Sequence, residues 1–452
     1  MASEVGAAPH LDCHGVIHIQ RAASLRQKLF WSFLMVVCVA FGIYSCAMIT
    51  VEYMGHPTAT RIKINQVDSM ILPRITLCPN SPDAFEQELL DGYLSRKLGA
   101  SQARKKKNLL AYILAGFGFQ KMSPFVGAWN ESNLEELDSL YQRLKGNRTQ
   151  MQYFTYFIDR FGFKCDQLFY RCDLGGARVA CCKLFISTYN LRRGKCLALK
   201  PVKQRIADEL GKLRLYLRQL PSAFDATGLQ PNIIVYTTDH QNDIAPYPRY
   251  YLSKGYVQKI RLQARQLRLI PNENFCLDAK QQSKGVLKYK TRSGCQIERW
   301  VTEILLGRLN CCLPYIETNL PLSICESKLV VSNYEAAIVS SSYRPQKTAC
   351  LLACNRWDYK FNWEFQRSAY KFNGYAFHLA VSYTELQFEE VAEVLTVTFY
   401  GYISQIGGQI GLFVGGSLIS ISQVLILAAI WTKNKAINLN NRQVDFIGDK
   451  PK

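Results

Sequence analysis

A Gly-Gly-Ser triplet at residues 415–417 lies within residues 394–432, which carry no charged side chain. In a membrane, irregular backbone is tolerated only where it is buried in protein or lines a water-filled path, and carbonyl oxygens on such a path replace the hydration shell of an ion. The triplet therefore indicates a narrow constriction for cations. Gly407, Gly411 and Gly415 recur at every fourth residue, a pattern that by itself indicates only close helix association.

Other residue types argue against an enzyme. The sequence has no glycine-rich phosphate loop, no nucleophile elbow and no histidine-based metal motif. The adjacent pairs Cys181-Cys182 and Cys311-Cys312 lack the spacing of zinc ligands. We therefore expect no catalysis, no bound metal and no cofactor.

The basic composition does not indicate a nucleic-acid partner. Lys and Arg number 55 against 35 Asp and Glu, a net charge of +20, and a basic surface binds phosphate without any motif. However, no zinc-finger spacing, basic-region heptad or aromatic ribonucleoprotein signature is present. The compact run Arg104–Lys107 is either an exposed loop tip or a site for a trypsin-like or furin-like protease, and we favour the loop tip.

Two long apolar segments predict the topology. Residues 29–51 are uncharged and long enough, at about 1.5 Å per residue, to cross a hydrocarbon core of about 30 Å, and residues 395–431 exceed one crossing. The first segment is too long for the apolar part of a cleaved signal peptide, and the 28 residues before it are too many. The second segment is followed by basic residues, which argues against a lipid-anchor tail. Because Lys and Arg beside a span stay cytoplasmic, both termini are expected inside a cell whose plasma membrane the chain crosses twice.

The predicted organisation follows from these spans. It comprises a cytoplasmic N-terminus (1–28), transmembrane helix 1 (29–51), an extracellular cysteine-rich domain (52–394), transmembrane helix 2 with a pore-lining segment (395–431), and a cytoplasmic C-terminus (432–452). All of the 16 cysteines except Cys13, Cys38 and Cys46 lie in the extracellular part, where disulfides persist. Their odd number leaves one free or intermolecular thiol. Glycosylation sequons at Asn130 and Asn147 give mild support for this placement.

The extracellular segment predicts a mixed α+β domain with a β-strand core and peripheral helices. A capping box from Ser132 to Glu135 predicts a helix start. A stripe of apolar residues follows on one face of that helix: Leu134, Leu137, Leu140, Tyr141 and Leu144. Alternating apolar residues predict half-buried strands at residues 213–217 and 260–264, and residues 232–236 read as a further short strand.

Residues 406–417, IGGQIGLFVGGS, closely resemble the pore helix of acid-sensing and epithelial sodium channels. Other segments resemble that degenerin and epithelial sodium channel family at the expected places. They are His14-Gly15, which resembles the family's gating motif, residues 72–80 (LPRITLCPN), which resemble its F-P-x-V-T-x-C-N segment, Gly194-Lys195-Cys196, and residues 269–276. The resemblance covers nearly the whole chain.

The resemblance implies a homo- or heterotrimeric, sodium-preferring, amiloride-sensitive channel, with two helices and a hand-like extracellular domain in each subunit. Gly415, Gly416 and Ser417 would form the selectivity filter. Ser404 would occupy the gating position at which a bulky side chain holds the channel open, and His14 and Gly15 would support the pore from the cytoplasm. Further pore-lining positions would be Gln405, Gly408, Gly411 and Gln423.

Disulfide pairs are also implied by the resemblance. They are Cys78 with Cys196, Cys276 with Cys354, Cys295 with Cys350, Cys312 with Cys325, and Cys172 with Cys182 or Cys181. One bridge of the family's thumb is absent, since Arg299 and Thr348 stand at its positions. Cys165 and Cys311 are left without an expected partner.

Two neutral amides depart from the family pattern. Gln405 stands where acid-sensing relatives carry a carboxylate, and Gln423 stands shortly after the filter, where most members carry one. A carboxylate ring concentrates cations at a pore mouth, so its loss lowers conductance or weakens selectivity. The alternative functions are an obligate heteromeric or non-conducting surface subunit, a non-conducting surface receptor or adhesion protein in which the glycines serve only helix packing, and a trimeric nucleotide-gated channel of the same topology. The stimulus, whether acid, force, peptide or constitutive opening, stays open.

Overall fold

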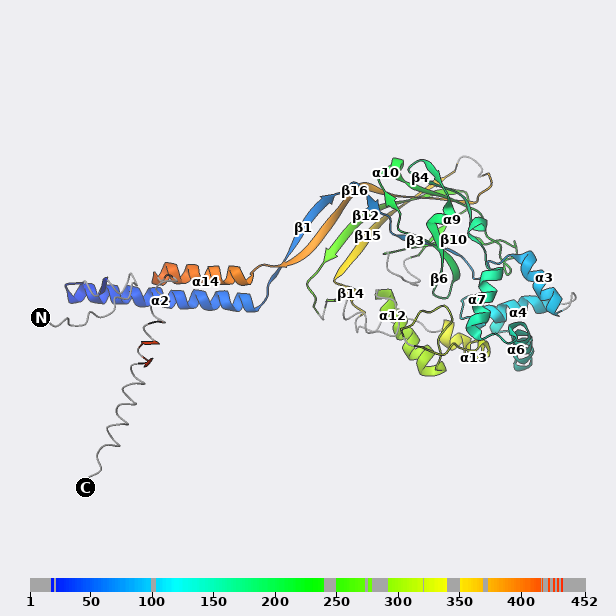
Figure 1. Ribbon diagram of the computed structural model, residues 1–452, viewed down its shortest axis with the longest axis horizontal. Coiled ribbons are helices and arrows are strands. Elements are labelled where there is room, and N and C mark those ends of the chain that lie inside the picture. The colour runs from blue at the N-terminus through cyan, green and yellow to red at the C-terminus, as the bar shows by residue number, and fades with distance from the viewer. Residues whose placement is uncertain are drawn as a thin grey trace, which may run out of the picture. The chain divides into compact units, whose positions relative to one another are not determined.

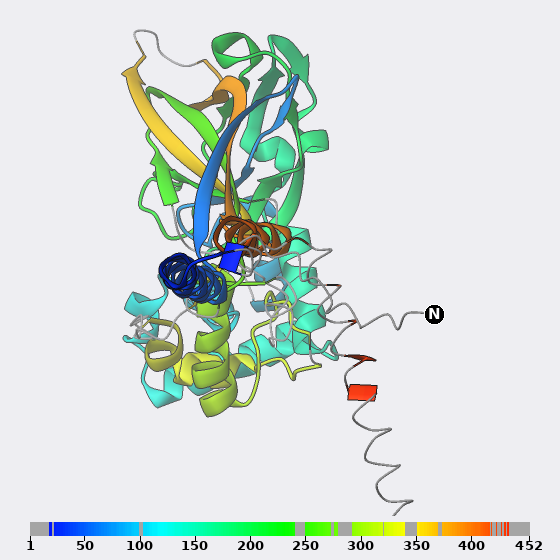
Figure 2. The ribbon, with the colours of Figure 1, turned by 90° about the vertical axis from the view of Figure 1, so that its left-hand side faces the viewer.

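The computed structural model describes residues 18–19, 22–98, 103–239, 249–272, 275–278, 292–319, 321–339, 350–368 and 373–415, with 417, 422, 426, 429–430 and 432–433. The chain divides into two compact units, residues 1–60 with 393–452 and residues 61–392. The first unit contains the helices α2 (Leu25–Met54) and α14 (Phe399–Val414), which lie side by side in Figures 1 and 2. The second contains the sheets and, among the described residues, the helices between residues 87 and 339.

Helix α2 contains the first predicted span. It begins after Ser24, whose hydroxyl oxygen accepts a hydrogen bond from the backbone N of Gln27 at 3.3 Å, and it extends beyond residues 29–51 at both ends. Within the described residues it is the helix whose length and composition suit a membrane crossing. The described part of α14 has 16 residues, fewer than the roughly 20 that a crossing needs, so the second span stays a prediction.

A seven-stranded sheet forms one layer of the second unit, as predicted for a β-strand core. Its strands follow the order β15-β12-β16-β9-β4-β5, and β1 pairs with β16. β12 runs parallel to β16, with a bulge between Leu262 and Ala264, and antiparallel to β15. The bounds are β1 (Thr58–Gln66), β4 (Phe169–Leu174), β5 (Ala177–Val179), β9 (Leu213–Leu217), β12 (Tyr256–Arg268), β15 (Asn355–Arg367) and β16 (Phe377–Leu395).

A five-stranded antiparallel sheet forms the second layer, in the order β11-β10-β3-β7-β6. Its strands are β3 (Arg74–Pro79), β6 (Phe185–Asn190), β7 (Gly194–Leu199), β10 (Ile233–Thr238) and β11 (Arg249–Leu252). Two small ladders join β2 (Met70–Ile71) with β8 (Lys203–Gln204) and β13 (Cys276–Leu277) with β14 (Leu352–Ala353).

The core of the sheets lies between the two layers. Leu77 and Val235 from the five-stranded sheet belong to the same buried cluster as Leu215, Ile260 and Leu379 from the seven-stranded sheet. The alternating residues of β9 and β12 supply this core from one face, because successive side chains of a strand point to opposite sides. The predicted strands at residues 213–217, 260–264 and 232–236 are confirmed as β9, β12 and β10.

The helices form a second core, grouped beside the sheets in Figure 1. The longer ones are α3 (Gln87–Leu98), α4 (Ala103–Gly116), α6 (Glu131–Lys145), α7 (Gln150–Phe161), α12 (Arg292–Trp300) and the π-helical η1 (Val301–Leu309). The shorter ones are α5 (Ser123–Val126), α13 (Ser327–Ser332) and the π-helical η2 (Glu335–Val339). Three further short helices, α8 (Cys165–Leu168), α9 (Cys181–Leu184) and α10 (Asp208–Gly211), lie beside the strands instead, and Leu168 belongs to the core of the sheets (Figure 1).

Helix α6 confirms the predicted apolar stripe but corrects its start. Leu137, Tyr141 and Leu144 are buried. The capping box from Ser132 is wrong, because Asn130 is the N-cap and its side-chain oxygen accepts a hydrogen bond from the backbone N of Asn133 at 2.9 Å. An Asn at this position satisfies a helical N–H that otherwise lacks a partner, and it competes directly with a serine two residues later.

The basic run at residues 104–107 is not the loop tip that the sequence favoured. It belongs to the first turns of α4, where Lys105 forms an ion pair with Glu136 of α6 at 2.8 Å. Residues 109–115 of the same helix are all buried, so the apolar half of α4 holds its basic half in helical conformation.

Three implied disulfides are present: Cys78–Cys196, Cys276–Cys354 and Cys295–Cys350. For Cys172, the pairing with Cys182 is wrong, because Cys172 pairs with Cys181, the alternative, and Cys182 bonds to Cys165. The turns α8 and α9 flank the hairpin of β4 and β5, and their contact brings Cys165 and Cys182 together.

The expected Cys312–Cys325 bridge is wrong, since Cys325 bonds to Cys311. The backbone of Cys312 is held by two hydrogen bonds, from its N to the O of Ser323 at 2.8 Å and from the N of Cys325 to its O at 3.0 Å. Its side chain is buried in the helical core, and burial raises the pKa of the thiol to about 11. Cys312 is therefore an uncharged, inaccessible thiol and not a site for an intermolecular bridge.

Candidate functional site

One face of α14 packs on α2. The Tyr402 ring stacks on Tyr53 with ring centroids 4.4 Å apart, and its hydroxyl lies 3.1 Å from the Oγ1 of Thr50. About three turns further on, Phe413 lies against Gly42, where an added Cβ would approach the Cβ of Phe413 to 3.3 Å. Gly42 is the buried residue of α2, so a larger side chain there would push the two helices apart.

The opposite face of α14 has almost no side chains. At about 100° per residue, the glycines at 401, 407, 408 and 411 share one arc with Ser404, on the side away from Tyr402 and Phe413. Ser404, Gly408 and Gly411 are exposed, and a Cβ added at Gly407 or Gly408 would meet no atom within 4 Å. We define the small-residue face as residues 401, 404, 407, 408 and 411, and among the described residues it is exposed from residue 404 to residue 411.

The helix ends at the first residue of the predicted filter. Gly415 is the C-cap in a left-handed conformation (φ 66°, ψ 20°), and its N–H donates to the carbonyl of Gly411 at 3.1 Å. This conformation costs an L-residue roughly 1–2 kcal/mol and costs glycine little, which explains why the helix stops here. Gly415 thus makes the last i→i−4 hydrogen bond of α14, and the regular helix ends at the position where the sequence predicts ion contacts.

The structure groups some of the predicted site residues and leaves others undescribed. Ser404, Gly408 and Gly411 lie on the small-residue face, Gln405 is exposed at its edge, and Ser417 is exposed beyond the helix end. Four predicted positions lie outside the described residues: His14, Gly15, Gly416 and Gln423. The sequence did not predict the contacts of Tyr402 and Phe413 with α2, although aromatic residues in and beside both apolar segments were a usable signal.

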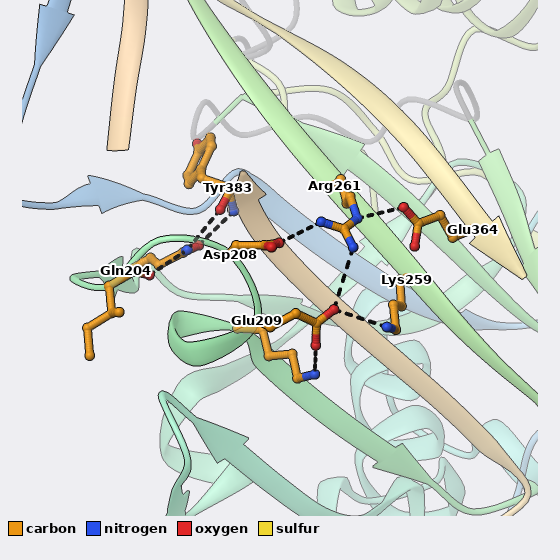
Figure 3. Close-up of polar contacts among 9 residues, drawn as sticks. Gln204, Asp208, Glu209, Lys259, Arg261, Glu364 and Tyr383 are labelled. Carbon is orange, nitrogen blue, oxygen red and sulfur yellow. Dashed lines mark hydrogen bonds and ion pairs between the residues drawn. The ribbon is translucent and has the colours of Figure 1, made fainter. Parts of the chain in front are cut away.

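In the second unit, Arg261 joins three elements (Figure 3). Its guanidinium lies 2.7 Å from the Oδ1 of Asp208 in α10 and 2.6 Å from the Oε1 of Glu364 in β15. Arg261 itself belongs to β12. The turn α10 begins at Asp208 with a positive φ of 47°, and this ion pair helps to hold that conformation.

Glu209 extends the network to two lysines. Its carboxylate pairs with Lys212 and lies 3.0 Å from the Nζ of Lys259 in β12. The hydrogen bond from Lys212 is the main reason that the pKa of Glu209 falls to about 2, with Lys259 contributing in the same direction. The carboxylate therefore keeps its charge throughout the physiological pH range, and α10 stays tethered to the sheet.

A buried amide fixes strand β16 beside this network. Gln204 donates to the O of Tyr383 at 3.1 Å and accepts from its N at 2.8 Å (Figure 3). The Tyr383 hydroxyl donates to the O of Ile71 at 2.8 Å. Residues 396–398 are all that separate β16 from α14 in sequence, and β1, which pairs with β16, follows α2 with a similarly short connection. The two paired strands, β1 and β16, are therefore joined in sequence to α2 and α14 by three residues each.

His378 of β16 is a half-buried, uncharged imidazole in the same sheet. Its ring stacks on Tyr216 at 4.5 Å, and its Nε2 has no hydrogen-bond partner among the described residues. Burial is the main cause that lowers the pKa of His378 to about 4; the charges of Arg214, Lys212 and Lys259 add to it, and Asp173 opposes it.

This arrangement predicts a pH dependence of stability. Between pH 6.5 and 4 the unfolded chain binds a proton at His378 that the folded chain excludes, so stability falls as the pH drops through this window. Lowering the pH from 7.5 to 5 reduces the free energy of unfolding of the unmodified chain. Allowing for partial exposure, we expect this reduction to be about 1–2 kcal/mol smaller in His378→Gln. Thermal melting of the detergent-solubilised full chain at pH 7.5 and pH 5 measures this, and an equal acid shift of the melting temperature in both proteins would contradict it.

Comparison with known proteins gives a family match. The model of the family described as amiloride-sensitive sodium channel matches residues 9–427. The chain matches none of the curated proteins. Among solved structures, a cryo-EM structure of a proton-activated chloride channel is 5% identical, with a TM-score of 0.32 over 89% of this chain and 98% of that one. A likeness that weak supports no argument about function.

Proposed function

The chain belongs to the amiloride-sensitive sodium channel family and is an ion channel subunit, and from this premise we propose that it forms part of a trimeric, sodium-preferring, amiloride-sensitive channel of the plasma membrane. Both termini are cytoplasmic, and the second unit is extracellular. The single observation that carries the proposal is the small-residue face of α14, which lies opposite the contact with α2 and leads to the left-handed Gly415.

This face suits the centre of an assembly. The aromatic contacts with α2 occupy the other side of α14, so three copies of the small-residue face can approach one another closely around an axis. Gly415, Gly416 and Ser417 then line the constriction, with Gln405, Gly408, Gly411 and Gln423 along the pore. Exposed backbone at membrane depth needs a water-filled path, which such an assembly supplies.

The aromatic residues of the helix pair support a membrane placement. Trp31 lies near the start of α2 and Tyr53 near its end, and the rise of 22 residue steps from one to the other corresponds to roughly 33 Å of helix. Trp and Tyr are enriched at both surfaces of a bilayer, whose hydrocarbon core is about 30 Å thick. Tyr400 of α14 is also exposed, and in this placement it belongs to the same membrane surface as Tyr53.

Gating passes through the extracellular unit in this proposal. The Gln204–Tyr383 pair holds β16, the strand that continues into α14, and the Arg261 network holds β12, which pairs with β16. A stimulus that shifts these strands therefore acts on the pore helix. His378 is unsuited to sense protons near neutral pH, because its pKa lies at about 4. His14 and Gly15 are proposed to act from the cytoplasmic side.

A second candidate is an obligate heteromeric or non-conducting subunit, favoured by the neutral Gln405 at the edge of the small-residue face. The test is expression in oocytes, alone and with related subunits, with current recorded under sodium replacement and amiloride and with surface delivery quantified. Sodium-dependent, amiloride-sensitive current from the chain alone supports the self-sufficient channel. Silence despite surface delivery, with current restored by a partner subunit, supports the heteromer.

A further inference from the structure

The helical part of the extracellular unit contains a pocket of about 360 Å³ between α4, α5 and α6. Its lining combines aromatic, aliphatic and amide side chains, chiefly Phe125, Trp129, Leu140, Asn108, Asn133 and Glu136. The volume lies in the range of small-molecule sites. Glu136 is held at the rim by its ion pair with Lys105, and Trp129 is half-buried beside Tyr112, with ring centroids 6.1 Å apart.

The asparagine of the first sequon adjoins this pocket. Asn130 follows Trp129 directly and precedes Asn133 by three residues, one helical turn, and both of these neighbours line the pocket. The Asn130 side chain is exposed, and its oxygen accepts a hydrogen bond from the backbone N of Asn133. Its nitrogen, the atom to which an N-linked glycan attaches, is not used by the cap. Capping and glycosylation are therefore compatible at the same residue.

We propose that Asn130 carries an N-linked glycan whose first N-acetylglucosamine folds back into this pocket. Like a short linker, the attachment gives the sugar a high effective concentration at the site, so even weak contacts keep it bound. The aromatic ring of Trp129 offers an apolar surface for the C–H face of the sugar. Asn108, Asn133 and Glu136 offer donors and acceptors for its hydroxyl and acetamide groups.

Asn147 provides a matched control within the chain. It lies in the exposed connection between α6 and α7, and it is not among the residues that line the pocket. The sequon threonine, Thr149, caps α7 through its hydroxyl oxygen, which accepts from the backbone N of Gln152 at 3.2 Å. A glycan at Asn147 is therefore expected to extend freely into solvent.

The test uses the native full-length chain from cells that retain high-mannose glycans. Endoglycosidase H, which cleaves between the two core sugars, is applied over time, and each site is followed by mass spectrometry. We expect release at Asn130 to be at least roughly tenfold slower than at Asn147, and equal release after denaturation. Trp129→Ala and, separately, Asn108→Ala should bring the two native rates together while leaving both sequons intact.

Each outcome has a distinct meaning. Equal native rates in the unmodified chain, or an unoccupied Asn130 beside an occupied Asn147, would overturn the inference. The inference rests on the extracellular placement in the proposed function, and absence of glycan at both sites in surface-delivered protein would instead overturn that placement. A native rate difference that neither variant removes would show that the protection arises elsewhere than in the pocket.

Discussion

Ser404→Phe is expected to produce a standing, amiloride-sensitive inward current in any assembly of this chain that conducts. Ser404 lies on the small-residue face of α14, opposite the rings that bind α2. A closed pore in which three such faces meet has no room for a phenyl ring, whereas a wider open pore does. Overpacking of this kind costs about 1–3 kcal/mol, which corresponds to a shift of roughly 5- to 150-fold in the ratio of open to closed channels.

The neighbouring residue provides the control. Ile403 is also exposed but lies off the small-residue face, so Ile403→Phe introduces the same ring without obstructing the approach of the helices. Resting current under sodium replacement, divided by surface-labelled protein, is the measurement. Equal resting currents from the two variants would show that the small-residue face of α14 does not surround the pore.

Local sequence patterns, which span only a few residues, predicted much of the fold. The alternation of apolar and polar residues in β9 and β12 was sufficient to predict these strands, because a strand with one buried face places an apolar side chain at every second residue. The stripe on α6 was equally readable, but the first residue of the helix was not, since Ser132 and Asn130 are both good N-caps and their side chains alone do not decide between them. The basic run of α4 was misjudged because its buried apolar half, residues 109–115, decides the conformation of the whole helix.

Pairings over long distances were predictable only in part. The resemblance implied Cys78–Cys196 over 118 residues, yet it failed for the adjacent cysteines at 311 and 312. A shift of one residue reverses the side to which an extended side chain points, and no sequence pattern specified that register. The same limit applies to the site: the sequence predicted the glycines of α14, whereas only the folded structure shows which face of α14 carries the small residues and which face contacts α2.

Gly415→Val is expected to abolish most of the sodium current without preventing surface delivery. The left-handed backbone at Gly415 ends α14, and a β-branched residue there favours a helix that continues through the proposed filter. Continued helix returns the filter carbonyls to internal hydrogen bonds and removes them from the ion path. A free-energy difference of about 1.4 kcal/mol in favour of the continuous helix reduces the population of the helix that ends at residue 415 tenfold. We therefore expect at least roughly a tenfold reduction in current per surface channel.

Gly415→Asn separates backbone conformation from side-chain size. Asn is close to Val in volume but adopts the left-handed conformation more readily than other non-glycine residues. If the helix break at Gly415 carries the function, Asn retains several times more current than Val, and its reversal potential keeps more of the preference for sodium over potassium. Equal losses in the two variants would mean that the space at residue 415, and not the left-handed end of α14, is what the channel requires.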